Sequence, residues 1–203
     1  MRALVGAALL AFATPVAAQI LPATYSVTGV AADDVLNVRA APDAAAAAIA
    51  GLSYDASGIE VVALSADGKW AQVNVDEAAG WAALRFLARE PGPDWTALQS
   101  PLECHGTEPF WRLSLNPSGN GAYYELAGNE GLVADVVWSA AATNGSPVAG
   151  FRLDHAEFDG FATVTAGSCS DGMSDRMMGL SVGLFLTTPK GEVGYSGCCT
   201  LAP

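Results

Sequence analysis

All four cysteines of the chain lie in its second half, at positions 104, 169, 198 and 199. An even number of cysteines in an exported chain predicts disulfides rather than free thiols. Cys198 and Cys199 are adjacent, and adjacent residues on a strand point to opposite faces, so each requires its own partner. We expect the bonds Cys169–Cys198 and Cys104–Cys199. The exchanged arrangement remains the alternative.

Residues 1–18 have the pattern of a cleavable export signal. Arg2 precedes an apolar run from Ala3 to Ala13, and Ala18 is the small residue before the expected cleavage site. The apolar run is well short of the roughly 20 residues that span a bilayer. We therefore expect a soluble periplasmic or secreted protein with no membrane span.

The chain is strongly acidic, with 21 Asp and Glu against nine Lys and Arg and a net charge of −12. A nucleic-acid partner is excluded on this ground, because neutralising phosphates requires clustered cations. Anionic lipid surfaces are disfavoured for the same reason. The acidity is typical of an exported protein kept in solution by mutual repulsion.

A segment rich in proline and glycine divides the chain. Residues 90–94 read Glu-Pro-Gly-Pro-Asp, which interrupts helices and strand ladders alike. We expect two domains, over residues 24–89 and 102–203, joined by a linker over residues 90–101. At these sizes each hydrophobic core is marginal without further stabilisation.

Apolar residues alternate through the first domain at the two-residue spacing of half-buried strands. The pairs that carry this pattern are Leu36/Val38, Ile59/Val61, Trp70/Gln72 and Val73/Val75. Asp67-Gly68 is a hairpin turn signal between two of these runs. The first domain is therefore expected to be a small β structure.

Three motifs in this domain, taken in order, resemble bacterial SH3-like (SH3b) domains. They are Leu36-Asn37-Val38-Arg39-Ala40-Ala41-Pro42, Gly68-Lys69-Trp70-Ala71-Gln72-Val73 and Gly80-Trp81. The resemblance implies a small barrel, from a family whose members often bind peptidoglycan or serve as scaffolds. It also implies that two segments with helical propensity, 44–48 and 77–88, form a loop and a last strand with a short helical turn.

Aromatic side chains would supply the ligand contacts of such a barrel. The candidates are Tyr25, Tyr54, Trp70 and Trp81. The alternative for each is packing in the core, where aromatic rings bury most area. Asn37 and Arg39 are expected to hold their strand to the turn at Pro42 rather than to bind a ligand.

The second domain contains repeated short apolar runs separated by glycine turns, which indicates an antiparallel β-barrel or sandwich. Its motifs Gly106-Thr107-Glu108-Pro109-Phe110-Trp111 and Cys169-Ser170-Asp171-Gly172-Met173-Ser174-Asp175, with the terminal Gly197-Cys198, resemble a family of exported bacterial proteins. That family is distantly similar to META/HslJ-type and NlpE-type β-barrel domains. The resemblance implies a fold and no activity. The predicted fold class is all-β throughout.

Several residues of the second domain invite a chemical interpretation. Cys104 and His105 suggest a thiol nucleophile and its base, but a disulfide would remove the thiolate. Cys104, His105, Cys198 and Cys199 are metal-ligand types without the spacing of a zinc motif. His155 lies between Asp154 and Glu157, in a polar loop. We expect no metal and no cofactor at these positions.

The segment Asp171–Asp175 alternates oxygen ligands near a glycine, but it lacks the length and terminal Glu of a calcium loop. A turn closed by its own side chains, with Arg176 available to pair a carboxylate, is the simpler interpretation. Glu108 and Asp175 would form an acid pair for hydrolysis only if the fold brought them together. No G-x-S-x-G elbow or phosphate-binding glycine loop is present.

These observations predict a non-enzymatic protein that binds or organises cell-envelope material. The first domain would contact peptidoglycan or a peptide, and an envelope protein is the other partner considered. A periplasmic module for a small ligand or metal is one alternative, and a cell-wall hydrolase is another. Contact with the wall would be aromatic and directed to peptides, because anionic wall polymers repel an acidic chain.

Overall fold

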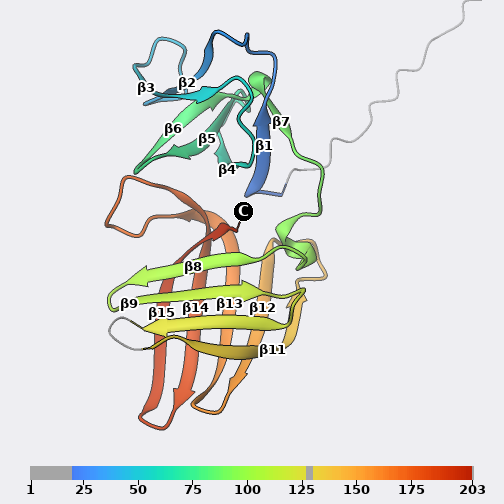
Figure 1. The fold of residues 1–203 in the computed structure, drawn as a ribbon, viewed down its shortest axis with the longest axis vertical. Coiled ribbons are helices and arrows are strands. Elements are labelled where there is room, and N and C mark those ends of the chain that lie inside the picture. The colour runs from blue at the N-terminus through green and yellow to red at the C-terminus, as the bar shows by residue number, and fades with distance from the viewer. Residues whose placement is uncertain (1–19, 127–129, 203) are drawn as a thin grey trace, which may run out of the picture.

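The computed structural model describes residues 20–126 and 130–202, so the expected export signal over residues 1–18 lies outside the described residues. The described chain is all-β, apart from two short 3₁₀ turns. An N-terminal sheet lies beside a C-terminal barrel, and the C-terminus lies between them (Figure 1). The prediction of an all-β fold is therefore confirmed.

The N-terminal sheet has seven strands in the order β3-β2-β6-β5-β4-β1-β7, and every pair in it is antiparallel. The strands are β1 (Ala23–Val27), β2 (Val35–Arg39), β3 (Ala48–Ser53), β4 (Ile59–Leu64), β5 (Trp70–Val75), β6 (Ala78–Ala83) and β7 (Leu87–Arg89). The segment 44–47 is a loop, and the 3₁₀ turn η1 (Leu84–Phe86) separates β6 from β7. Tertiary pairing thus overrides the helical propensity of both segments.

The core of the N-terminal sheet is small and aliphatic. Its buried members are Ala23, Tyr25, Val27, Leu36, Val38, Ile59, Val61, Ala71, Val73, Ala82 and Leu87. In β4 the residues Ile59 and Val61 point into this core, so Glu60 between them points to the opposite face. That face is the one nearest the barrel.

The C-terminal unit is a closed eight-stranded barrel in the order β10-β11-β12-β13-β14-β15-β8-β9, again antiparallel throughout. Its strands are β8 (Leu102–Thr107), β9 (Phe110–Asn116), β10 (Gly121–Leu126), β11 (Leu132–Ala141), β12 (Val148–His155), β13 (Phe158–Cys169), β14 (Met178–Thr188) and β15 (Gly191–Leu201). The expected antiparallel barrel is thus present. The sandwich alternative is not the observed fold.

Two disulfides close the end of the barrel that faces the N-terminal sheet. Cys104 on β8 is bonded to Cys199 on β15, and Cys169 on β13 is bonded to Cys198. Cys198 and Cys199 are neighbours on β15, and their side chains point to opposite faces of the strand, so each bonds a different cysteine. The bonds follow the first of the two arrangements that the sequence left open. Cys104–Cys199 links the first barrel strand to the last, and Cys169–Cys198 links β13 to the last.

Side chains fill the barrel interior. Its largest fully buried members include Phe151, Leu113, Leu153 and Leu184, and Trp111 is almost completely buried as well. Eight strands leave an interior that side chains of this size can occupy. The barrel is therefore a packed core rather than an open channel.

The barrel contacts the N-terminal sheet through the loop between β13 and β14. The Asn74 side chain on β5 donates to the carbonyl of Met177 (2.8 Å) and accepts from its amide (2.9 Å). Asp175 pairs with Ala78 at the start of β6, where the amide of Ala79 donates to the Asp175 carbonyl. Backbone and side-chain bonds together attach this loop to the first unit.

The expected linker over residues 90–101 also contacts both units. It contains the 3₁₀ turn η2 (Trp95–Ala97), and Trp95 is 2% exposed within the barrel core cluster. The Trp95 indole donates to the carbonyl of Leu21, next to β1 (3.3 Å). Proline and glycine end the strand ladder here, but the segment is a packed element of the interface rather than a free connection.

Candidate functional site

The four aromatic candidates of the first unit occupy three different environments. Tyr25 is only 2% exposed within the core of the N-terminal sheet, so its proposal as a surface ligand contact is wrong. Burial raises the pKa of its phenol. Tyr54 is 41% exposed in the turn after β3. The structure does not bring Tyr25 or Tyr54 together with the two tryptophans.

Trp70 and Trp81 lie on one face of the sheet. Trp81 on β6 is opposite Gln72, and Trp70 lies two residues before Gln72 on β5. Both indoles are half-buried. A groove of about 270 Å³ beside Trp70 is lined by Arg39, Arg85 and Phe86 among others. Arg39 donates to the carbonyl of Ala46 (2.7 Å), so it holds its strand to the loop before β3 rather than to Pro42 itself.

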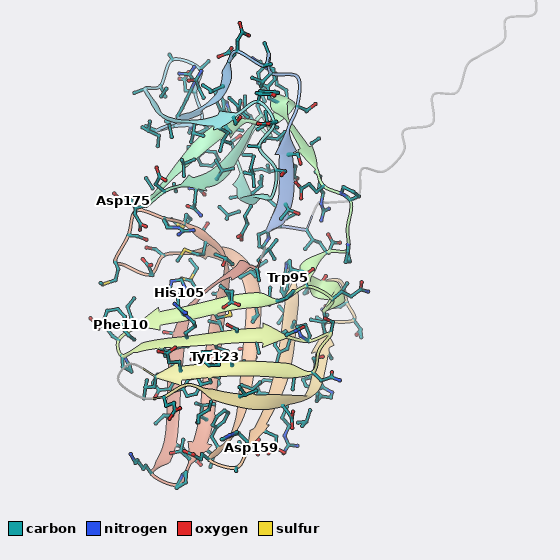
Figure 2. The ribbon with its side chains drawn as sticks, viewed as in Figure 1. Trp95, His105, Phe110, Tyr123, Asp159 and Asp175 are labelled. Atoms are coloured by element: carbon teal, nitrogen blue, oxygen red, sulfur yellow. A yellow bond between two sulfur atoms is a disulfide. The ribbon has the colours of Figure 1, made fainter. Side chains whose placement is uncertain are left out.

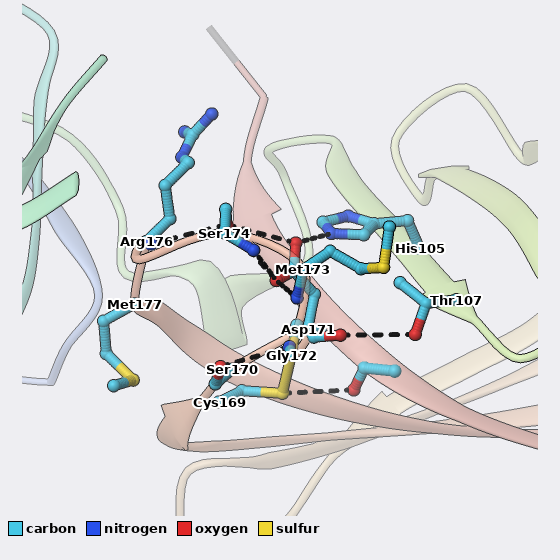
Figure 3. Close-up of polar contacts among 12 residues, drawn as sticks. His105, Thr107, Cys169, Ser170, Asp171, Gly172, Met173, Ser174, Arg176 and Met177 are labelled. Atoms are coloured by element: carbon cyan, nitrogen blue, oxygen red, sulfur yellow. Dashed lines mark hydrogen bonds and ion pairs between the residues drawn. A yellow bond between two sulfur atoms is a disulfide. The ribbon is translucent and has the colours of Figure 1, made fainter. Parts of the chain in front are cut away.

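The Asp171 segment forms a turn closed by its own side chains (Figure 3). Asp171 Oδ1 accepts from the amides of Met173 (2.9 Å) and Ser174 (3.0 Å), and His105 Nε2 lies 3.5 Å from Oδ2. The hydrogen bond from the Met173 amide is the largest of the contacts that lower the Asp171 pKa. The carboxylate that would bind calcium is therefore already engaged by the loop.

The other reactive groups of the barrel are also accounted for. The thiol of Cys104 is part of a disulfide. His155 Nδ1 accepts from the Glu157 amide (3.1 Å), and its ring lies 5.3 Å from that of Phe158. Within residues 20–126 and 130–202 no three His, Cys, Asp or Glu side chains are grouped as metal ligands.

A cleft with a volume of about 860 Å³ lies between the two units. One wall comes from β1 and β4 of the N-terminal sheet, and the other comes from the end of β15. Arg176, from the loop that docks on the sheet, and Trp95 complete the lining. The site is therefore assembled by both units and exists only where they meet.

Glu60 and Arg176 give this cleft its chemical character. Glu60 Oε2 accepts from the amide of Leu201 (3.3 Å). Glu60 Oε1 and Arg176 Nε are inaccessible to solvent and have no hydrogen-bond partner in the part of the chain that the structure describes. A buried polar atom without a partner costs about 1–3 kcal/mol. The two residues that carry these atoms, one an acceptor and one a donor, both line the cleft.

Burial changes the titration of Glu60. Desolvation raises the pKa of this carboxyl to about 7, although the Leu201 amide and the Arg176 charge both oppose the change. Glu60 therefore changes charge near neutral pH, unlike an ordinary exposed glutamate. A perturbed carboxyl beside a cation in a cleft is a recognised mark of functional sites.

The cleft can accept one hydrogen-bond donor and one acceptor from the same ligand. Both atoms are covered in this structure, so a ligand reaches them only when the side chains over them shift. An ammonium group would then donate to Glu60 Oε1, and a carboxylate would accept from Arg176 Nε. Sequence reasoning identified Arg176 as available to pair a carboxylate but did not identify Glu60. The only signal was a glutamate between the apolar Ile59 and Val61, which is equally typical of an exposed strand face.

Comparison of the chain with known protein families, with curated proteins and with solved structures finds no match in any of the three. In the described residues, no helix is both long and apolar enough to cross a bilayer.

Proposed function

We propose that this chain is a non-enzymatic protein of the bacterial cell envelope that binds a peptide carrying a free amino group and a free carboxylate in the cleft between its two units. The single observation that carries the proposal is that Glu60 and Arg176 line the same cleft, and that each has a buried polar atom, Glu60 Oε1 and Arg176 Nε, with no hydrogen-bond partner among the described residues. The stem peptides of peptidoglycan have this chemistry. The first unit would contribute Glu60, and the barrel would contribute Arg176.

Two other features support a site of action in the envelope. The pattern of residues 1–18 is that of an export signal. The two disulfides indicate an oxidising, non-cytoplasmic compartment. The resemblance of residues 24–89 to SH3b domains adds a peptidoglycan-related expectation, and the cleft provides a position for the peptide that the tryptophan face alone does not.

Calorimetric titration of the chain lacking residues 1–18 tests this proposal. The probes are muropeptides from digested peptidoglycan, the dipeptide Ala-Ala, and N-acetyl-Ala-Ala-amide, in which both charges are removed. We expect the uncapped probes to bind at least about tenfold more tightly than the capped dipeptide, because each bond to a charged group contributes roughly 1.5–3 kcal/mol. Binding of the uncapped probes should strengthen as the pH rises through 7 and Glu60 ionises.

Matched variants assign the effect to the cleft. Glu60→Gln should weaken binding and remove its pH dependence, and Arg176→Gln should weaken it at every pH. Glu157→Gln and Arg85→Gln, at exposed positions outside the cleft, should change little. Equal affinity for capped and uncapped dipeptides, or no binding of muropeptides, would reject the proposal.

A further inference from the structure

A row of aromatic side chains crosses the outer surface of the barrel. Trp138 on β11 is paired with Arg152 on β12, Arg152 with Phe161 on β13, and Phe161 with Phe185 on β14. The three rings remain exposed, at 49% for Trp138, 38% for Phe161 and 58% for Phe185. We call Trp138, Arg152, Phe161 and Phe185 the aromatic row.

The rings of this row lie against glycines instead of standing away from the sheet. A Cβ at Gly150 would come within 3.0 Å of the Phe161 ring and 3.1 Å of the Trp138 ring. A Cβ at Gly183 or Gly194 would come within 3.3 Å or 3.2 Å of the Phe185 ring. The planes of the Trp138 and Phe161 rings differ by only 27°. Glycine on the same or a neighbouring strand thus lets each ring lie close to the backbone, so that the three rings cover adjacent parts of the barrel surface.

A row of polar side chains runs beside the aromatic row on the same face of the sheet. It consists of Asp135, Asp154, Asp159, Thr187 and Glu192, each paired with the next across adjacent strands. All five are exposed, and we call them the acidic row because four of the five are carboxylates. A depression of about 600 Å³ is lined by part of this row and by Phe161 and Phe185. Like charges directly opposite each other destabilise a sheet, so folding alone does not account for three neighbouring aspartates.

The charges around the rings restrict what can bind them. An anionic ligand would be repelled by the acidic row. A cationic side chain docking on the rings would meet Arg152, which lies between Trp138 and Phe161 and pairs with Asp159 (3.3 Å). An uncharged ligand with many hydroxyls avoids both penalties, since carboxylates accept from hydroxyls and a guanidinium donates to them. Its C–H faces would also match the negative faces of the aromatic rings.

We propose that the aromatic row and the acidic row form a binding surface for an uncharged polysaccharide, with pyranose rings stacked on Trp138, Phe161 and Phe185. Asp159, Thr187 and Glu192 would hydrogen-bond the sugar hydroxyls. Asp159 lies at the end of the barrel far from the N-terminal sheet (Figure 2), so this surface is separate from the interdomain cleft and does not depend on its ligand. A chain with both sites would hold a peptide at one end and a glycan at the other.

Titration of the chain lacking residues 1–18 with chitohexaose and with cellohexaose tests the proposal, read by calorimetry and by tryptophan fluorescence. We expect saturable binding of at least one of these neutral glycans, with little change between low and high salt. Phe185→Ser and Phe161→Ser should each weaken binding by about tenfold or more. Both positions are exposed on the barrel surface, and thermal unfolding of each variant would verify that the fold is retained.

Val133→Ser is the matched control, because Val133 is 72% exposed on the same strand as Trp138 but lies outside the aromatic row. It should leave glycan affinity within about twofold of the original. Glu60→Gln should also leave it unchanged, which separates this surface from the cleft. The proposal is overturned if the chain binds neither glycan, or if Val133→Ser weakens glycan binding as much as Phe185→Ser does. Concentration-dependent dimerisation abolished by Phe185→Ser, without glycan binding, would assign the surface to a second copy of the chain instead.

Discussion

The two β units of this protein are stabilised in different ways. The barrel closes its hydrogen-bond ladder on itself, contains two disulfides, of which one joins its first strand to its last, and buries large side chains such as Trp111 and Phe151. The N-terminal sheet ends at β3 and β7, contains no cysteine and buries mainly alanine, valine and leucine. A closed ladder has no free edge, whereas an open sheet has two.

This difference indicates a division of roles. We expect the barrel to be the more stable unit. The N-terminal sheet is held to it by hydrogen bonds at Asn74, Ala79 and the Trp95 segment. The cleft lies along this junction, where polar atoms remain unpaired. Functional sites commonly keep such locally destabilising groups, and favourable packing elsewhere in the fold offsets the loss of stability.

The largest expected effect comes from removing the bond that joins the two ends of the barrel. The variant Cys104→Ala/Cys199→Ala opens a loop with a sequence separation of 95 residues. On the chain-entropy model this lowers the free energy of unfolding by about 4.7 kcal/mol, against about 3.6 kcal/mol for Cys169→Ala/Cys198→Ala. Chemical denaturation of both variants measures the two losses.

Hydrogen exchange by segment shows where that loss falls. Exchange should accelerate in the barrel strands β8 and β15, while residues 23–89 keep most of their protection, because the N-terminal sheet contains no cysteine. Equal acceleration in both units would mean that they unfold together, and the contrast drawn above would not hold.

A smaller effect is expected from the titration of Glu60 at the junction. Its pKa is raised from 4.5 to about 7 in the folded chain, so protonation stabilises the fold. The stabilisation is complete below about pH 4.5 and is lost as the pH rises through 7, by at most about 3 kcal/mol. Denaturation at a series of pH values measures this slope. Glu60→Gln should flatten it, and Glu157→Gln, an exposed control, should not.

The smallest of the three effects tests the attachment of the two units. Asn74→Ala removes both hydrogen bonds to Met177 and should cost about 1–3 kcal/mol. Because the docked loop carries Arg176, the same variant should weaken peptide binding in the cleft. Asn37→Ala is the control, because Asn37 is exposed on β2 and its side chain makes no hydrogen bond among the described residues, so the contact expected with the turn at Pro42 is not present. Unchanged stability and binding in Asn74→Ala would mean that other contacts position the loop.

Much of the secondary structure was predictable because alternation is a local property. The pairs Leu36/Val38 and Ile59/Val61 lie on strands and point into the core. Trp70 and Gln72 also lie on a strand, but they point away from the core, while Ala71 and Val73 fill it. A two-residue period identifies a strand without stating which of its faces is buried.

Local patterns also did not identify which residues are buried by distant parts of the chain. Tyr25 was a candidate ligand contact, but it lies on the face of β1 that packs into the core. Residues 90–101 were expected to be a linker and do connect β7 to β8, but prolines and glycine gave no sign that this segment packs against both units. Trp95 is buried there only because the barrel and the strand preceded by Leu21 both reach it.

By itself, the sequence determined the class of the fold, the need for two separate cysteine partners at Cys198 and Cys199, and an acidic net charge, which argues against a nucleic-acid partner. Only the tertiary structure decided which residues meet. Glu60 and Arg176 are brought to one cleft by the docking of two units, and Trp138, Phe161 and Phe185 are aligned by the register of four barrel strands. Register and docking depend on pairings between residues far apart in the chain, and local patterns do not encode them.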